Sequence, residues 1–316
     1  MDYTTPSALD DSASAAATIA PGGDVVFTIG PEGRRVRVFS LFARTASPVL
    51  DAMLSPYFKE GYQLKQLGET EIPLPDDNAK ALEIIFTIIH GQNDKVPDTL
   101  TPEELLQIAI TGDKYCCFTA LKFAIDKWLD HTYNIIDPGD PAETWTLALA
   151  ALVFNRQSTF AKVTSSLVLC HAGSYLDLVR KDEVPDRATQ IKTAAMLEIA
   201  RNKLRQHLLT EVLKSDFAIK KGQHRPNGFK VFMQRTSNLI EDSISSNIEA
   251  LTREKRLPPA DYWDDICRME HVFHSIAESC VAVHEADNGL CLKCAKTDEA
   301  HEKHATATAG GVASSS

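Results

Sequence analysis

The chain has 316 residues, of which 44% are hydrophobic and 24% are charged, and its formal net charge is −10. This composition is typical of a globular protein, and the negative charge disfavours general binding to the phosphates of nucleic acids. No apolar run approaches the roughly 20 residues that a membrane-spanning helix needs, so no membrane association is expected. The seven cysteines are odd in number, and Cys116 and Cys117 are adjacent, which favours reduced thiols over a disulfide framework. The N-terminal residues lack the basic and apolar parts of a secretory signal, so we expect an intracellular protein of the nucleus or cytoplasm.

The two ends of the chain are predicted to lack stable structure. Residues 1–21 are rich in Ser, Ala, Thr and Asp, and residues 305–316 are rich in Ala, Thr, Gly and Ser. Such segments bury too little apolar surface to offset the entropy that they would lose on ordering. We therefore expect a disordered leader and a disordered tail.

A β-hairpin is predicted directly after the leader. The apolar run 25–29 ends at the turn residues Gly30-Pro31-Glu32-Gly33. Val36 and Val38 then alternate with Arg35, Arg37 and Phe39 over residues 35–39. Alternation of this kind is typical of a strand with one solvated face, and the intervening turn residues separate two such strands.

Helix signals follow the hairpin. Ser40 is placed to cap one helix, and Ser47-Pro48 predicts the start of a second one, with proline in its first turn. After a polar loop, residues 71–75 predict a short extended piece that its prolines keep out of the middle of a sheet. Three further helices are predicted at 78–90, from Thr101 onward, and around 120–128.

This order of elements within residues 24–130 resembles the BTB/POZ domain. The segments that carry the resemblance are DVVFTIGPEGRRVRVFSLFARTASPVLDAML, EIPLPDDNAKALEIIFTIIHG and TPEELLQIAITGDKYCCFTALKFAIDKWL. One departure is Phe39, which precedes Ser40 where many members of the family carry a structural histidine. The resemblance implies an α+β fold, in which a small sheet is flanked by paired helices, for a BTB/POZ domain at residues 22–130.

The remainder of the chain is predicted to be mostly helical. Residues 131–260 look like the helical extension that follows the BTB domain in many filamentous-fungal proteins. A C-terminal helix and a Cys/His-rich segment are expected at 261–304. The candidate helices of the extension lie at 142–154, 160–169, 192–214 and 238–251.

No catalytic residues are predicted. The sequence contains no P-loop, nucleophile elbow, dinucleotide-binding glycine motif or H-E-x-x-H zinc motif. Paired carboxylates such as Glu103-Glu104 occur where the start of a helix favours negative charge. We therefore expect a protein that is not an enzyme.

The resemblance implies a partner-binding site after the second helix. BTB proteins that bind a cullin scaffold carry an apolar residue, any residue and a glutamate there, and Phe58-Lys59-Glu60 fits this pattern after Met53 and Leu54. An exposed aromatic side chain can fill a pocket of a partner, and the neighbouring glutamate can accept hydrogen bonds. The alternative is that Phe58 folds back over its own core. The predicted partner-binding residues are Met53, Leu54, Phe58 and Glu60.

Self-association is the second function that is common in the family. Domain-swapped BTB dimers place an extra strand and helix before the first core strand. Residues 1–23 show neither pattern, so this form of dimer is not expected, whereas pairing through exposed helices or strand edges stays open.

A structural zinc site is one interpretation of the C-terminal cysteines. Cys291-x-x-Cys294 supplies two thiolates, and Cys280 and His284 share one helix face at i, i+4 spacing. These four residues make a closed tetrahedral set for one Zn²⁺ ion. The alternative is that the cysteines are half-buried helix residues. A basic stretch at 192–235, with ten basic and three acidic residues, more often forms a solvated helix face than a nucleic-acid site.

Together these patterns predict a protein–protein interaction adaptor. The first candidate partner is the cullin scaffold of a ubiquitin ligase complex, in which the helical extension recruits an unknown substrate protein. The alternative is a self-associating BTB scaffold, or a transcription-associated protein, with a structural zinc site near the C-terminus. The partner would then be another BTB chain.

Overall fold

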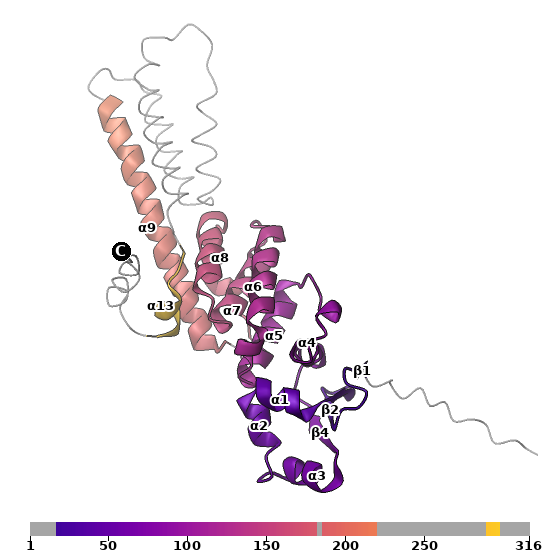
Figure 1. Cartoon of the computed structure of the whole chain (residues 1–316). Coiled ribbons are helices and arrows are strands. Elements are labelled where there is room, and N and C mark those ends of the chain that lie inside the picture. Colours follow the sequence, from indigo (N-terminus) through magenta and orange to yellow (C-terminus); the bar gives the residue numbers. More distant parts are fainter. Residues whose placement is uncertain (1–16, 182–184, 220–288, 298–316) are drawn as a thin grey trace, which may run out of the picture. The chain divides into compact units, whose positions relative to one another are not determined.

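The computed structural model describes residues 17–181, 185–219 and 289–297 (Figure 1). The chain divides into an N-terminal unit, Met1–Trp128, and a C-terminal unit, Leu129–Ser316. The structure belongs to the predicted α+β class, because it is mostly helical with one small sheet. Among the described helices, none is both long enough and apolar enough to cross a membrane.

The sheet of the N-terminal unit has four strands in the order β1-β3-β2-β4. The predicted hairpin is confirmed, since β2 (Val25–Ile29) pairs antiparallel with β3 (Arg34–Val38) and places Phe27 opposite Val36. The predicted extended piece is strand β4 (Thr70–Leu74), which runs parallel to β2 at one edge of the sheet. An edge strand needs no ladder bond on its outer side, and β4 therefore accommodates a proline.

At residues 17–21 the structure differs from the predicted leader. Ala17–Thr18 forms strand β1, which pairs in parallel with β3, and Ile19 and Ala20 are buried. The N–H of Ala20 donates to the carbonyl of Arg37, and the side-chain amide of Gln92 donates to the carbonyl of Ile19. The segment is thus ordered by long-range pairing, and the expectation that no extra strand precedes the core is wrong. Residues 1–16 lie outside the described part.

The first helix is capped by a residue that is distant in the sequence. Helix α1 (Ser40–Ala46) has Phe39 at its N-cap, and the carboxylate of Asp24 accepts hydrogen bonds from the N–H of Ser40 at 2.7 Å and from its hydroxyl at 2.6 Å. Ser40 is therefore not the cap that the sequence predicts. Helix α2 (Pro48–Met53) does have its predicted cap, because the side chain of Ser47 accepts from Leu50.

Helix α3 (Lys59–Leu67) occupies the segment that was predicted to be a polar loop. Most of its residues are exposed. The segment therefore lacks the apolar face by which a helix is predicted from sequence. Gly61 allows this helix to lie close to the turn that precedes it. A Cβ atom on Gly61 would stand 2.1 Å from the carbonyl oxygen of Ser55, which only glycine avoids.

The remaining helices of the N-terminal unit are α4 (Ala79–Ile89), the short 3-10 helix η1 (Asn93–Lys95), α5 (Pro102–Lys114) and α6 (Phe118–Ile135), which extends across the division between the units. Asn78 caps α4, and Thr101 with Glu104 forms a complete capping box on α5. Phe86 of α4 stacks on Phe27 of the sheet at a centroid distance of 5.0 Å. The core thus lies between one face of the sheet and α4.

The C-terminal unit contains the helices α7 (Pro141–Val153), α8 (Gln157–Cys170), η2 (Tyr175–Leu178) and α9 (Arg187–Ile219). These helices confirm the predicted ones at 142–154, 160–169 and 192–214. Helix α7 is buried along nearly its whole length, from Thr144 to Val153. The predicted helix at 238–251 lies outside the described residues.

The segment 289–297 packs against the C-terminal unit although about 70 residues separate it from α9 in the sequence. It contains helix α13 (Leu292–Lys296), which contacts α8 and α9 (Figure 1). Gln157 donates its side-chain N–H to the carbonyl of Leu290 and accepts from the N–H of Leu292, and Thr164 accepts from the N–H of Leu290. A Cβ atom on Gly289 would stand 2.0 Å from the carbonyl oxygen of Ala161, so this close approach requires glycine.

Candidate functional site

Three aromatic side chains are exposed where α2 turns into α3. Tyr57 is 95% exposed, Phe58 is 54% exposed and Tyr62 is 58% exposed. Phe58 is the N-cap of α3, and the N–H of Tyr62 donates to the carbonyl of Phe58 at 2.9 Å, as expected for residues one helical turn apart. We call these three residues the aromatic turn.

The structure separates the predicted partner-binding residues into two groups. Phe58 is exposed and Glu60 is half-buried in the first turn of α3, so both are accessible. Met53 is half-buried, whereas Leu54 is only 2% exposed and belongs to the core. Leu54 is therefore removed from the site, because it is the C-cap of α2 and its side chain is buried. The leucine at this position packs in the core and is not available for contact with a partner.

The sequence interpretation missed Tyr57 and Tyr62 as site residues. The i, i+4 spacing of Phe58 and Tyr62 would have placed them on one helix face if α3 had been predicted. Large exposed aromatic residues are enriched at protein interfaces, because they bury a large area at a small cost in side-chain entropy. The aromatic turn therefore has the composition of a protein-binding surface.

A second exposed apolar surface lies on α1. Leu41 is 70% exposed, Phe42 is 43% exposed and Phe39 is 39% exposed. The rings of Phe39 and Phe42 lie 6.3 Å and 5.1 Å from the ring of His90. We call these four residues the α1 patch.

His90 holds the α1 patch in place as a neutral imidazole. Its Nε2 atom accepts from the N–H of Phe39 at 3.0 Å, and its Nδ1 atom lies 2.7 Å from the carbonyl of Phe86 and donates to it. Burial lowers the pKa of His90, although the contact with the Phe86 carbonyl acts in the opposite direction. Protonation would remove the acceptor, so the arrangement favours the neutral form.

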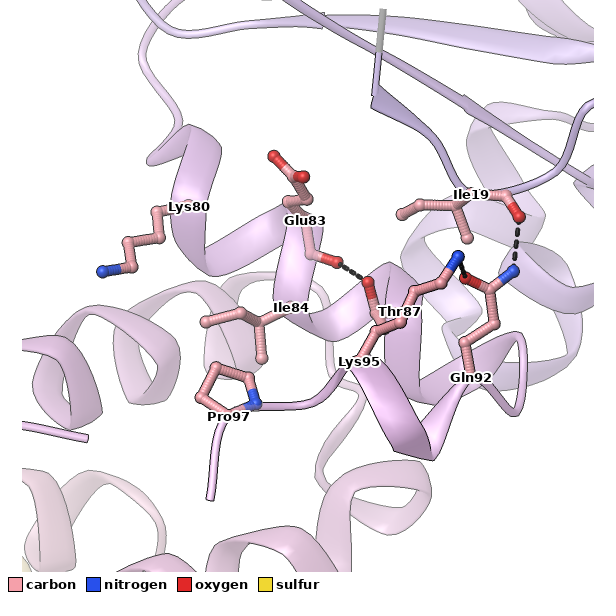
Figure 2. Close-up of a pocket in the computed structure, with 8 residues that line it drawn as sticks. All are labelled: Ile19, Lys80, Glu83, Ile84, Thr87, Gln92, Lys95 and Pro97. Atoms are coloured by element: carbon pink, nitrogen blue, oxygen red, sulfur yellow. Dashed lines mark hydrogen bonds between the residues drawn. The ribbon is translucent and has the colours of Figure 1, made fainter. Parts of the chain in front are cut away.

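A pocket of about 350 Å³ lies between α4, η1 and the residue after β1 (Figure 2). Its polar groups are already engaged: Gln92 bonds to Ile19 and Lys95, and Lys80 forms an ion pair with Glu104. None of the predicted site residues lines it. The lining residues are Ile19, Lys80, Glu83, Ile84, Thr87, Gln92, Lys95 and Pro97.

A cluster of hydrogen-bonded polar residues in the N-terminal unit connects the ends of its helices. Asp77 is 8% exposed and accepts hydrogen bonds from Lys114 at 2.9 Å and from the hydroxyl of Tyr115 at 3.0 Å. Burial, together with the Asp77 charge, raises the pKa of Tyr115. The hydroxyl of Ser47 donates to the carbonyl of Tyr115 while it caps α2. No base activates this serine, so the cluster joins α2, α4 and α5 and does not form a nucleophile with its base.

Only half of the predicted zinc ligands lie in the described part of the chain. Cys291 is the N-cap of α13 and Cys294 lies in its first turn, and both are half-buried. Cys280 and His284 lie outside the described residues. Within the ranges that are described, no three His, Cys, Asp or Glu side chains gather as metal ligands would. The tetrahedral set stays a prediction.

The chain was also compared with known proteins. No family model, curated protein or solved structure matches it.

Proposed function

We propose that the N-terminal unit is a BTB/POZ-type domain and that the protein is an interaction adaptor. The order of elements supports this proposal: a β-hairpin, a helix pair, an edge strand parallel to the first strand of the hairpin, and then further helices. The adaptor acts by presenting surfaces, with no catalytic step of its own. The helical C-terminal unit would then carry the second binding surface, for a substrate protein.

The exposure of Phe58 is the observation that carries the choice of partner. A ring that is 54% exposed, between Tyr57 and Tyr62, is available to fill a pocket of another protein. Glu60 stands in the same turn as a hydrogen-bond acceptor and can fix the orientation of the partner. We propose the N-terminal domain of a cullin as this partner, which makes the chain a substrate adaptor of a ubiquitin ligase.

The test is a calorimetric titration of the full chain with a cullin N-terminal domain. The wild type is expected to bind with a Kd of about 1 μM or tighter, and Phe58→Asp is expected to weaken binding at least about 30-fold, since loss of an interface anchor costs about 2 kcal/mol or more. Phe123→Asp is the matched control, because Phe123 is 86% exposed on α6, far along the chain from the aromatic turn. No binding by the wild type would remove the cullin as partner, and equal binding by Phe58→Asp would remove the aromatic turn as the site.

Self-association is a second candidate function, which the α1 patch favours. The N-cap residue Phe39 and the α1 residues Leu41 and Phe42 are all exposed, and exposed apolar side chains that gather in this way are typical of an interaction site. Among the described strands, β1 lies at the opposite edge of the sheet from β4, and a sheet edge is a surface on which a further strand can pair. A second copy of the chain is the proposed occupant.

Sedimentation velocity over a concentration series tests this second function. The wild type is expected to form dimers that Leu41→Asp dissociates, because a charge at a 70% exposed position is solvated in the monomer and desolvated in the dimer. Leu67→Asp is the control, since Leu67 is 74% exposed on α3. A wild type that stays monomeric at all concentrations contradicts self-association.

A further inference from the structure

The two thiols of α13 lie next to each other on a segment that the fold holds in place. Cys291 occupies the N-cap of α13 and Cys294 the third helical position, and a hydrogen bond joins their side chains. The N-cap and N3 side chains of a helix are close enough to bond to each other's backbone. A disulfide between them needs their Cβ atoms to approach to about 3.5–4.5 Å, and the extended backbone of the N-cap residue Cys291 leaves its side chain free of the helical geometry.

The surrounding contacts fix the backbone that carries these thiols. Leu292 and Ala295 are 4% and 1% exposed, so α13 is anchored by its apolar face. Gln157 bonds to the backbone on both sides of Cys291, at Leu290 and Leu292. The thiols are therefore presented by a rigid support, while both remain partly accessible to solvent.

Within the described residues, no third metal-ligating side chain joins Cys291 and Cys294. Two cysteines of this spacing are a substrate for thiol–disulfide exchange.

Two of the other described cysteines, Cys117 and Cys170, lack these properties. Cys117 is 1% exposed, and burial raises its pKa to about 12. A thiol that is both buried and protonated does not exchange. Cys170 is half-buried at the end of α8, with no second cysteine at close sequence spacing. These residues serve as internal controls.

We propose that Cys291 and Cys294 form a reversible redox site that is oxidised by low-molecular-weight disulfides such as oxidised glutathione. One of the two cysteines, as its thiolate, attacks the glutathione disulfide, which gives a mixed disulfide and releases one glutathione thiolate that takes up a proton. The other cysteine then loses its proton and attacks the protein sulfur of the mixed disulfide, which releases the second glutathione. The two cysteines lose two electrons and two protons in total, and oxidised glutathione gains them. The site does not depend on the proposed adaptor function.

The test uses the full chain in buffers with a graded ratio of oxidised to reduced glutathione. Remaining thiols are blocked with N-ethylmaleimide, and the chain is digested with trypsin without reductant. Cleavage after Lys293 separates Cys291 from Cys294, so a bridge between them appears as residues 269–293 linked to the tripeptide 294–296. Because Cys280 lies in the same peptide as Cys291, the experiment is repeated with Cys280→Ser.

The linked peptide is expected to increase with the proportion of oxidised glutathione, in the wild type and in Cys280→Ser, and to disappear on reduction. Cys117 is expected to stay reduced, and Cys291→Ser is expected to leave Cys294 as a mixed disulfide. Thiols that stay alkylated at every ratio, or mixed disulfides on both cysteines without a bridge, would overturn the proposal. One equivalent of zinc in the purified chain, lost in both Cys291→Ser and Cys294→Ser, would also overturn it and support the tetrahedral site.

Discussion

Arg201→Ala is expected to destabilise the C-terminal unit by about 3–5 kcal/mol, as the loss of one partner from a buried charged network does. The Arg201 side chain is 6% exposed, and its guanidinium donates to the carbonyls of His171, Ala172 and Gly173 and to the carboxylate of Glu198. It also stacks on the ring of Tyr175 at 4.5 Å from the centroid. Its removal leaves three backbone acceptors without their donor.

The measurement is urea unfolding of the full chain, with hydrogen exchange of residues 171–178 to report on the C-terminal unit. Arg201→Lys is expected to recover little of the stability, because an ammonium group cannot reproduce the planar fork that reaches the carbonyls and the carboxylate. Lys203→Ala, an exposed change on the same helix, is expected to stay within about 0.5 kcal/mol of the wild type. Equal stability of Arg201→Ala and Lys203→Ala would show that the guanidinium contacts with residues 171–173, Glu198 and Tyr175 do not stabilise the C-terminal unit.

Phe27→Ala is the substitution with the largest expected effect on the N-terminal unit, also about 3–5 kcal/mol. Phe27 is fully buried at the centre of β2, where it lies opposite Val36 on β3 and Ile72 on β4. It also stacks on Phe86 at 5.0 Å. Alanine removes the whole ring, and three elements border the resulting cavity, so the site cannot collapse to fill it.

Urea unfolding also checks this prediction, here with hydrogen exchange of residues 25–38. Phe27→Leu is expected to recover more than half of the lost stability, since it refills most of the cavity. Thr28→Ala is the control on the opposite face of the same strand, where the hydroxyl donates to Glu71 at an exposed position. A Phe27→Ala protein that is as stable as Thr28→Ala would show that the stacked pair is not the centre of the core.

The candidate site was predicted in part. The family resemblance implied Phe58 and Glu60 as partner-binding residues and left self-burial of Phe58 open, and Phe58 is exposed. The same prediction included the core residue Leu54 and missed Tyr57 and Tyr62. Apolar character alone does not distinguish a buried leucine from an exposed one. That distinction depends on how the end of α2 packs in the folded chain.

Long-range contacts decided the features that the sequence did not reveal. The Asp24 carboxylate caps α1 from 16 residues away, and β1 is ordered by pairing with β3. The segment 289–297 is held by Gln157 and Thr164, which precede it by more than 120 residues. No local pattern signals such partners, because each partner supplies hydrogen bonds only after the chain has folded.

Local chemistry determined the elements themselves. The alternation of residues 35–39, the caps at Ser47 and Thr101, and the apolar spacing of α4 and α7–α9 specify hydrogen bonds and faces within a few residues, so the sequence alone predicts them. The tertiary structure decided which apolar side chains are left outside, at the aromatic turn and the α1 patch. It also fixed the backbone of α13, which carries the two thiols, through contacts with distant residues. The burial of a residue depends on the packing of such distant elements and not on its sequence neighbours.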